Sequence, residues 1–322
     1  GTHSTFFGPL KYGILPQHLS AAELTGGNGL VQMATFLAIL MGTMFGGLVI
    51  AIPGSGPWIA GLTVVLIAIL GRWASAWIPE AAPAEPGMRF DWNAFRQTWR
   101  VLGYASEARI ILQAILAISW FWFLGATFLS LVPDFTRSTL HGNEQVATLL
   151  LTAFSVGIGV GSVLCERLSR GEVEPGLAPI GALGLAFFAW DLSGVDVPVV
   201  TGALTAAEFL RDGAYWRVLM DLTLIGFCGG IYVVPLYALV QHRCNPQRRS
   251  RIIAANNILN ALFMVASALI VIGLVQAGFG PQRIFLLAAA ATALVLVSLC
   301  VLLPEVMTRS VGLLRNWVRL QG

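Results

Sequence analysis

The sequence predicts an all-α, polytopic membrane protein. Hydrophobic residues make up 57% of its 322 residues, charged residues only 11%, and the mean hydropathy is +0.78. Soluble domains carry about 25% charged residues, so this chain has too few charges to cover a surface that faces water. Apolar runs of about 20 residues, the length that a membrane-spanning helix requires, recur along the chain.

The predicted elements follow these apolar runs in order. Residues 4–16 form a short run, which we interpret as the tail of a spanning helix that ends at Pro16. The sequence PGSGP at 53–57 predicts a tight turn that joins the first two complete spans as a hairpin. Eight complete spans are predicted at 29–53, 57–79, 108–133, 146–166, 176–193, 218–241, 252–278 and 284–304.

Two polar segments flank the last six spans. The longer one, 80–107, begins as a Pro/Ala-rich linker and continues as WNAFRQTWRVL, which is typical of an amphipathic helix lying at the membrane interface. The tail 305–322 is also amphipathic and basic. Neither segment is long enough for a soluble domain.

The arginines predict the orientation of the spans. Alternating spans place 80–107, 167–175, 242–251 and the tail on one side. With Arg109 at the border of the first segment, this side has thirteen arginines against four on the other. Cytoplasmic loops carry the excess of basic residues, so this side, including the C-terminus, is predicted to be cytoplasmic. The thirteen are Arg89, Arg96, Arg100, Arg109, Arg167, Arg170, Arg243, Arg248, Arg249, Arg251, Arg309, Arg315 and Arg319, and the four are Arg137, Arg211, Arg217 and Arg283.

This topology is the pattern of a major facilitator transporter, which is built from two six-helix halves. On that interpretation, residues 1–79 are the remainder of the N-terminal half, with the end of helix 4 and helices 5 and 6. Residues 80–107 are the cytoplasmic linker, 108–304 the C-terminal half and 305–322 a cytoplasmic tail. The expected helices 1–3 would then be missing, and the chain would lack its true N-terminus. A protein of another class with eight or nine spans is the alternative.

Lys11 is the only lysine of the chain and lies within an apolar run. A lysine at mid-span costs about 2.5–3.5 kcal/mol on insertion scales and usually faces a cavity or a partner. Two interpretations remain open. Lys11 reaches the cytoplasmic headgroups along its own stem, or it faces a central cavity and attracts an anionic group such as a phosphate. Pro9 and Gly13 are expected to loosen the helix around it.

Amides form a second set of candidate substrate-binding residues. Asn28 and Gln32 are four residues apart near the cytoplasmic end of their span, and could line a cavity. Asn256, Asn257 and Asn260 occupy the first turns of an apolar helix. Amides within a membrane helix need partners, so hydrogen bonding between helices explains them as well as cavity lining does.

Charged pairs and small residues complete the candidates. Glu166 and Arg170 at the cytoplasmic end of one span, and Arg217 and Asp221 at the outer end of another, are each spaced as an i, i+4 ion pair. A gating role for the first pair, and proton or sodium binding by Asp221, are the alternatives. Pro235 is expected to bend its helix. The small residues Ala34, Ala38, Gly42 and Gly46 predict a close helix contact.

Other chemistry is not indicated. The cysteines form no CxxC pair and the histidines no HExxH motif, so no metal site or cofactor is expected. The arginines form no stripe that would indicate nucleic-acid binding.

Five segments resemble the bacterial lysophospholipid transporters of the major facilitator superfamily, in particular the type fused ahead of an acyltransferase. They are GPLKYGILPQHL, NGLVQMATFLAILMGT, FSVGIGVGSVLCERLSRG, GGIYVVPLYALVQHR and AANNILNALFMV. The resemblance implies that a lysophospholipid, notably lysophosphatidylethanolamine, is flipped inward across the inner membrane for re-acylation. It also implies that Lys11 lies in the cavity of the N-terminal half.

The chain departs from this family at two places. Many members have an acidic residue where this chain has Gln32, and some have an arginine where FLGATFLSLVP has none. No HxxxxD acyltransferase motif is present, so the chain contains no catalytic residue that the sequence identifies. Two other functions remain open: an efflux transporter for drugs or metabolites, and the membrane part of a bifunctional transporter–acyltransferase.

Overall fold

The computed structural model describes residues 2–50, 52–81, 93–106, 108–169, 172–198, 202–302 and 306–312, and its regular elements are helices. The predicted all-α polytopic class is confirmed, because seven described helices are long and apolar enough to cross a membrane and an eighth, α7, is apolar but shorter. The helices are α1 (Thr2–His18), α2 (Leu24–Ile50), α3 (Gly56–Ser75), α4 (Ala94–Ser106), α5 (Arg109–Ser138), α6 (Glu144–Ser169), α7 (Leu177–Ser193), α8 (Ala206–Arg211), α9 (Trp216–Arg243), α10 (Arg249–Gln276) and α11 (Pro281–Leu302).

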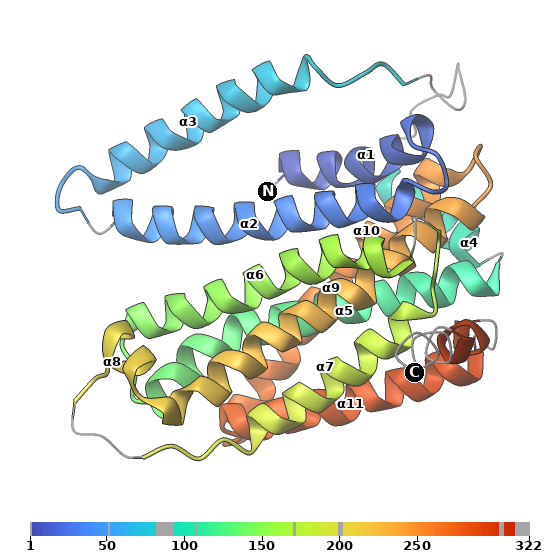
Figure 1. Cartoon of the computed structure of the whole chain (residues 1–322). Coiled ribbons are helices and arrows are strands. Elements are labelled where there is room, and N and C mark those ends of the chain that lie inside the picture. The colour runs from blue at the N-terminus through green and yellow to red at the C-terminus, as the bar shows by residue number, and fades with distance from the viewer. Residues whose placement is uncertain are drawn as a thin grey trace.

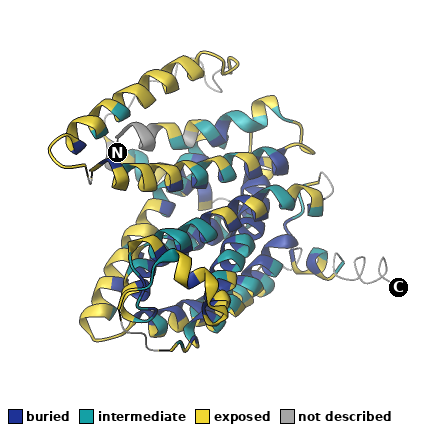
Figure 2. Ribbon diagram, turned by 60° about the vertical axis from the view of Figure 1, so that its left-hand side comes forward, coloured by how far each residue is buried: buried dark blue, intermediate teal, exposed yellow. Residues whose placement is uncertain are grey.

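The long helices lie roughly side by side (Figure 1). Helices α5, α6, α7, α9, α10 and α11 pack into one bundle, which α2 joins through α6 and α9, and α1 through α10. Helix α3 packs on α2 and is exposed along most of its length (Figure 2). Its apolar, exposed surface is what a helix facing lipid presents.

The helices continue through prolines that the sequence suggested would end or loosen them. Helix α1 runs without a break past Pro9 and Gly13 and ends at His18, two residues beyond Pro16. Helix α9 likewise continues through Pro235. These residues therefore do not interrupt their helices, and whether they bend them stays a prediction.

Glycines bring α6 and α9 into close contact. A Cβ atom at Gly157 or Gly161 of α6 would meet the backbone of Thr223 or Phe227 on α9. In the opposite direction, a Cβ atom at Gly230 of α9 would lie 2.5 Å from the backbone nitrogen of Ser162. Close backbone approach at small residues is the usual means of packing helices in a membrane, where the hydrophobic effect between helices is absent.

Helix α2 meets α6 through glycines other than the predicted ones. A Cβ atom at Gly29 would lie 2.5 Å from the carbonyl oxygen of Ser162, and one at Gly26 would lie 2.5–2.7 Å from the carboxylate of Glu166. In contrast, a Cβ atom at Gly42 or Gly46 would have nothing within 4 Å. The small-residue contact of α2 therefore lies nearer the N-terminus of the helix than the sequence suggested.

Replacing Gly29 by alanine is expected to lower the thermal stability of the purified protein, whereas Gly42→Ala is expected to leave it unchanged or raise it. Both changes lie on α2 and gain up to about 1 kcal/mol of helix propensity. Only the methyl group at position 29 overlaps another helix, which costs about 1–3 kcal/mol. Melting curves of the two variants in one detergent measure the difference. Equal melting temperatures would contradict the close contact of α2 and α6.

Candidate functional site

Lys11 lies at the junction of α1 and α2. Its side chain is half-buried, its Nζ atom donates to Thr35 Oγ1 of α2 at 3.0 Å, and Nζ lies 4.9 Å from the centre of the Tyr12 ring. Both neighbours are uncharged. Among the described residues Lys11 has no carboxylate within ion-pair distance. The position therefore holds a positive charge that the described part of the chain does not neutralise.

A reciprocal amide pair joins α2 to α9. Asn28 Nδ2 donates to Gln241 Oε1 at 2.6 Å, and Gln241 Nε2 donates to Asn28 Oδ1 at 3.0 Å. Both side chains are 1% exposed. One turn along α2, Gln32 Oε1 accepts from the Tyr12 hydroxyl at 2.9 Å. The predicted candidates Asn28 and Gln32 are thus buried in contacts between helices.

The carbonyl of Tyr12 provides a further link between α1 and α9, because Pro16 leaves it without a partner inside α1. Proline has no N–H, so within α1 the carbonyl of Tyr12, four residues earlier, receives no bond from it. Gln241 Nε2 donates to that carbonyl at 3.1 Å. The rings of Tyr12 and Tyr237 also stack, with centroids 4.4 Å apart. A backbone group that proline frees on α1 is therefore satisfied by a side chain of α9.

The amide side chains of α10 add further hydrogen bonds to this group of contacts. The Asn260 amide lies 2.9 Å from Ser119 Oγ of α5 and 3.4 Å from the Tyr237 hydroxyl. Trp122 Nε1 donates to that hydroxyl at 3.1 Å, and Asn256 interacts with it as well. Asn257 instead faces α1, where its Nδ2 atom would lie 2.9 Å from a Cβ atom at Gly8.

We call this set the polar layer: Tyr12, Asn28, Gln32, Ser119, Trp122, Tyr237, Gln241, Asn256 and Asn260. Lys11 and Asn257 border it. The structure therefore brings the six candidate substrate-binding residues to one region where α1 and α2 meet α5, α9 and α10. Whether they bind a substrate stays a prediction.

The charged pairs differ from the sequence prediction. Arg217 forms its salt bridge with Asp191 of α7, with Nη2 2.6 Å from Oδ1, rather than with Asp221 four residues along α9. Asp191 lies close enough to bind both the Nε and the Nη2 atoms of Arg217, and Asp221, which is 4% exposed, interacts electrostatically with both residues. The i, i+4 spacing correctly placed Arg217 and Asp221 on one face of α9. It did not show that α7, with Asp191, lies against that face.

The second pair is described only in part. Glu166 lies at the end of α6, with its carboxylate against the first turn of α2 at Gly26. A carboxylate there interacts favourably with the positive end of the α2 dipole. Arg170 lies outside the described residues, so its predicted pairing with Glu166 stays a prediction. No group of three or more potential metal ligands occurs among the described residues.

Three central residues were absent from the predicted site: Tyr12, Tyr237 and Gln241. Each is a hydrogen-bonding residue within an apolar helix, which is the same signal that identified Asn256 and Asn260. Tyr12 also follows Lys11 directly, and Gln241 lies four residues after Tyr237. The signal for all three was therefore present in the sequence.

The family model of the Major Facilitator Superfamily matches residues 4–268, which is most of the chain. The chain belongs to this superfamily. The match includes α1, α2 and the greater part of the bundle, so the polar layer lies within it. Helix content and family thus agree with the class predicted from the sequence.

Curated relatives carry a more specific name. The lysophospholipid transporter LplT of Cronobacter sakazakii is 29% identical over 252 residues, and those of Klebsiella pneumoniae and Escherichia coli O157:H7 are 28% identical over 251 and 254 residues. Each alignment covers 76% of this chain and 56% of the relative. The chain thus matches little more than half the length of these proteins.

Proposed function

We propose that this chain acts in a transporter that moves lysophospholipids such as lysophosphatidylethanolamine across the bacterial inner membrane. The direction is toward the cytoplasmic leaflet, where an associated or fused acyltransferase would re-acylate them. The observation that carries the proposal is Lys11, a half-buried lysine whose described neighbours are uncharged. The names of the curated relatives support the same class of substrate.

Lys11 suits a substrate with one phosphate. A cation held in low-dielectric surroundings without an anion nearby is costly. A phosphate diester would supply that anion, and hydrogen bonds to charged groups are roughly twice as strong as neutral ones. The bond from Nζ to Thr35 Oγ1 keeps the ammonium group on the side of α1 that faces α2.

A groove between α2 and α6, whose lining does not include Lys11, suits an acyl chain. It has a volume of about 420 Å³ and is lined by apolar side chains that include Met33, Leu37, Val156 and Val160. Arg167 lies among its lining residues, near the end of α6. The apolar lining complements a single acyl chain, and Arg167 is a second cation, distinct from Lys11, beside it.

We further propose that α1–α3 belong to the N-terminal half of the fold and α5–α11 to the C-terminal half, with the linker at 80–107 and the tail at 305–322 in the cytoplasm. The contacts of the polar layer then join the two halves near their cytoplasmic ends. In alternating access the two halves rock around a central site. The polar layer is accordingly the closed cytoplasmic gate of this state.

Uptake of labelled lysophosphatidylethanolamine tests the function. The full coding sequence that contains this chain would be expressed in spheroplasts of a host that lacks its own lysophospholipid transporter. Uptake above the empty-vector level is expected. Good expression without uptake would overturn the proposal, and would favour an efflux transporter of another substrate class.

A further inference from the structure

A carboxyl group of α9 is buried beside an ion pair, far along the helix from the polar layer. Asp221 lies in the second turn of α9, and Tyr237 of the polar layer follows about four turns later, or about 24 Å along the axis. Asp221 is 4% exposed, and its Oδ2 atom has no hydrogen-bond partner among the described residues. A buried carboxylate oxygen without a donor is costly, so this atom indicates that the site holds a ligand.

Two acidic side chains and one arginine meet at this site. Arg217 donates from Nη2 to Asp191 Oδ1 at 2.6 Å and from Nε to Asp191 Oδ2 at 3.0 Å, so both oxygens of Asp191 are engaged. Nη2 also donates to the Asp191 carbonyl at 3.1 Å, in the last turn of α7. The Asp221 carboxyl lies within hydrogen-bonding reach of Asp191, across the contact between α9 and α7. With both carboxyls ionised, the cluster would carry one negative charge that Arg217 does not neutralise.

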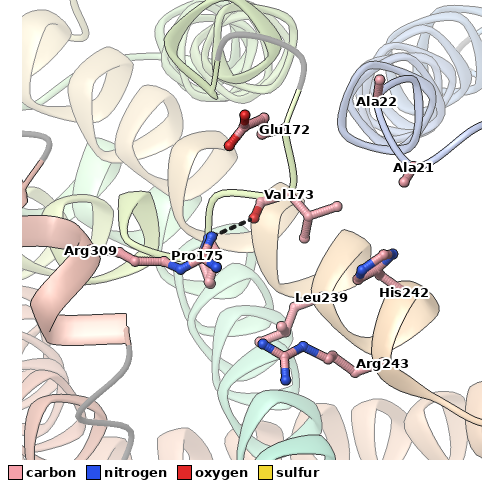
Figure 3. A pocket seen from close by; sticks show the side chains of 9 residues that line it. All are labelled: Ala21, Ala22, Glu172, Val173, Pro175, Leu239, His242, Arg243 and Arg309. Carbon is pink, nitrogen blue, oxygen red and sulfur yellow. Dashed lines mark hydrogen bonds between the residues drawn. The ribbon is translucent and has the colours of Figure 1, made fainter.

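The charged groups that act on Asp221 come from two helices. They are Asp191 of α7 and Arg217 of α9 itself. His242 and Arg243 lie at the other end of α9, beside a pocket of about 270 Å³ that Figure 3 shows. The other described charged residues around the first turns of α9 are exposed: Asp134, Arg137, Glu144, Asp196, Glu208, Arg211, Asp212 and Arg283. Arg217 is therefore the cation that acts on both carboxyls.

We propose that Asp221 binds a proton, which it shares with Asp191 in a hydrogen bond between α9 and α7. Two carboxylates in contact do not both ionise readily, so one of them keeps a proton. Asp191 is the ionised member because Arg217 binds both of its oxygens. The proton removes the buried charge of Asp221 and makes its carboxyl a donor, with the Asp191 carboxylate in reach as acceptor. This proposal goes beyond the transport function and does not require it.

A proton fits this site better than a metal cation. A hard metal cation takes several oxygen ligands at once. Both oxygens of Asp191 already accept from Arg217, whose positive charge would repel a second cation. The described part of the chain also brings no three potential metal ligands together. The Asp191 side chain is 28% exposed, so a proton that leaves Asp221 passes to Asp191 and then to water.

Infrared spectroscopy of the purified protein in detergent tests the site. A protonated carboxyl has a C=O stretch that a carboxylate lacks, and the difference between wild type and Asp221→Asn identifies the band of Asp221. We expect this band at neutral pH and expect it to disappear as the pH rises. Its half-loss should occur about 1–3 pH units lower in Asp191→Asn and about 1–3 units higher in Arg217→Gln, because each variant removes one charge beside Asp221.

Thermal stability gives a second readout. The folded wild type would hold a proton that a carboxyl of the unfolded chain releases above about pH 4. Because the folded state then binds more protons than the unfolded state, stability falls as the pH rises. The melting temperature of the wild type relative to Asp221→Asn is therefore expected to fall from about pH 4 up to the pH at which the band is lost.

The controls separate this site from transport and from misfolding. Asp196→Asn changes an exposed carboxyl in the loop after α7 and is expected to leave the band unchanged. If Asp221→Asn does not fold, the difference between wild type and Asp191→Asn at neutral pH should show the same band. No such band at neutral pH, or a band that Asp191→Asn leaves unchanged, would overturn the proposal. A band that sodium removes at constant pH would replace the proton by a metal cation. Neither readout uses lysophospholipid uptake, so failure of the transport function leaves this test intact.

Discussion

Lys11→Ala is expected to lower lysophosphatidylethanolamine uptake by about 10–100-fold with little change in expression. A hydrogen bond to a charged group contributes about 1.5–3 kcal/mol, and each 1.4 kcal/mol corresponds to a factor of ten. The alanine variant also removes a half-buried charge, so the protein itself should not lose stability. Lys11→Arg is expected to retain part of the uptake, because it keeps the charge but changes the geometry of the donors.

Thr35→Val is the matched control for Lys11. The change removes the hydroxyl to which Nζ donates but leaves the ammonium group in place. If charge is what the substrate requires, this variant should transport nearly as well as the wild type. Uptake by Lys11→Ala at the wild-type level would contradict a role of Lys11 in substrate binding. It would favour the other interpretation, in which Lys11 reaches toward the lipid headgroups.

The positions of the helices could be predicted from the sequence because one property decides them. A span must be apolar over about 20 residues, so its length and composition are visible without any neighbour. Each of the eight predicted complete spans corresponds to one helix of the structure. The predicted turn at 53–57 joins α2 to α3, and Gly54 in this turn has a φ of 74°. The amphipathic segment after the linker corresponds to α4.

Contacts between helices could not be predicted in the same way. Periodicity shows which residues share a face of a helix but not which helix lies opposite. Gly42 and Gly46 lie on one face of α2 and meet nothing, whereas Gly26 and Gly29 meet α6. Arg217 similarly has an acidic residue one turn away and binds Asp191 of α7 instead.

In the candidate site, too, the residues could be predicted from the sequence but their partners could not. The polar residues of α1, α2 and α10 were identifiable because each is rare within an apolar helix. Their bonding partners were not, since the pairing of Asn28 with Gln241 spans 213 residues of sequence. The link from Gln241 to the Tyr12 carbonyl depends on a proline four residues later, and becomes evident only when α9 is placed beside α1.

Breaking the amide pair between α2 and α9 is expected to open the gate that we propose for the polar layer. In Asn28→Leu, Gln241 Oε1 loses its Asn28 donor while remaining buried. A buried polar group without a partner costs about 1–3 kcal/mol, which changes the ratio of closed to open molecules by a factor of about 5–150. In Asn28→Leu/Gln241→Leu both amides of the pair are gone, so closure should recover in part, and the remaining loss reflects the Tyr12 carbonyl, which no longer has its Gln241 donor.

Spin labels on exposed residues at the ends of α1 and α9 measure this opening. Labels at His18 of α1 and Gln247, just after α9, would report the distance between the two proposed halves in a background without the four native cysteines. Asn28→Leu is expected to shift the distance distribution to longer values, and the double variant to shift it back. If Asn28 contacts substrate rather than closing the gate, uptake should fall with no change in the distribution. The comparison of distance with uptake therefore decides which role Asn28 has, since a gate residue changes both and a binding residue only the second.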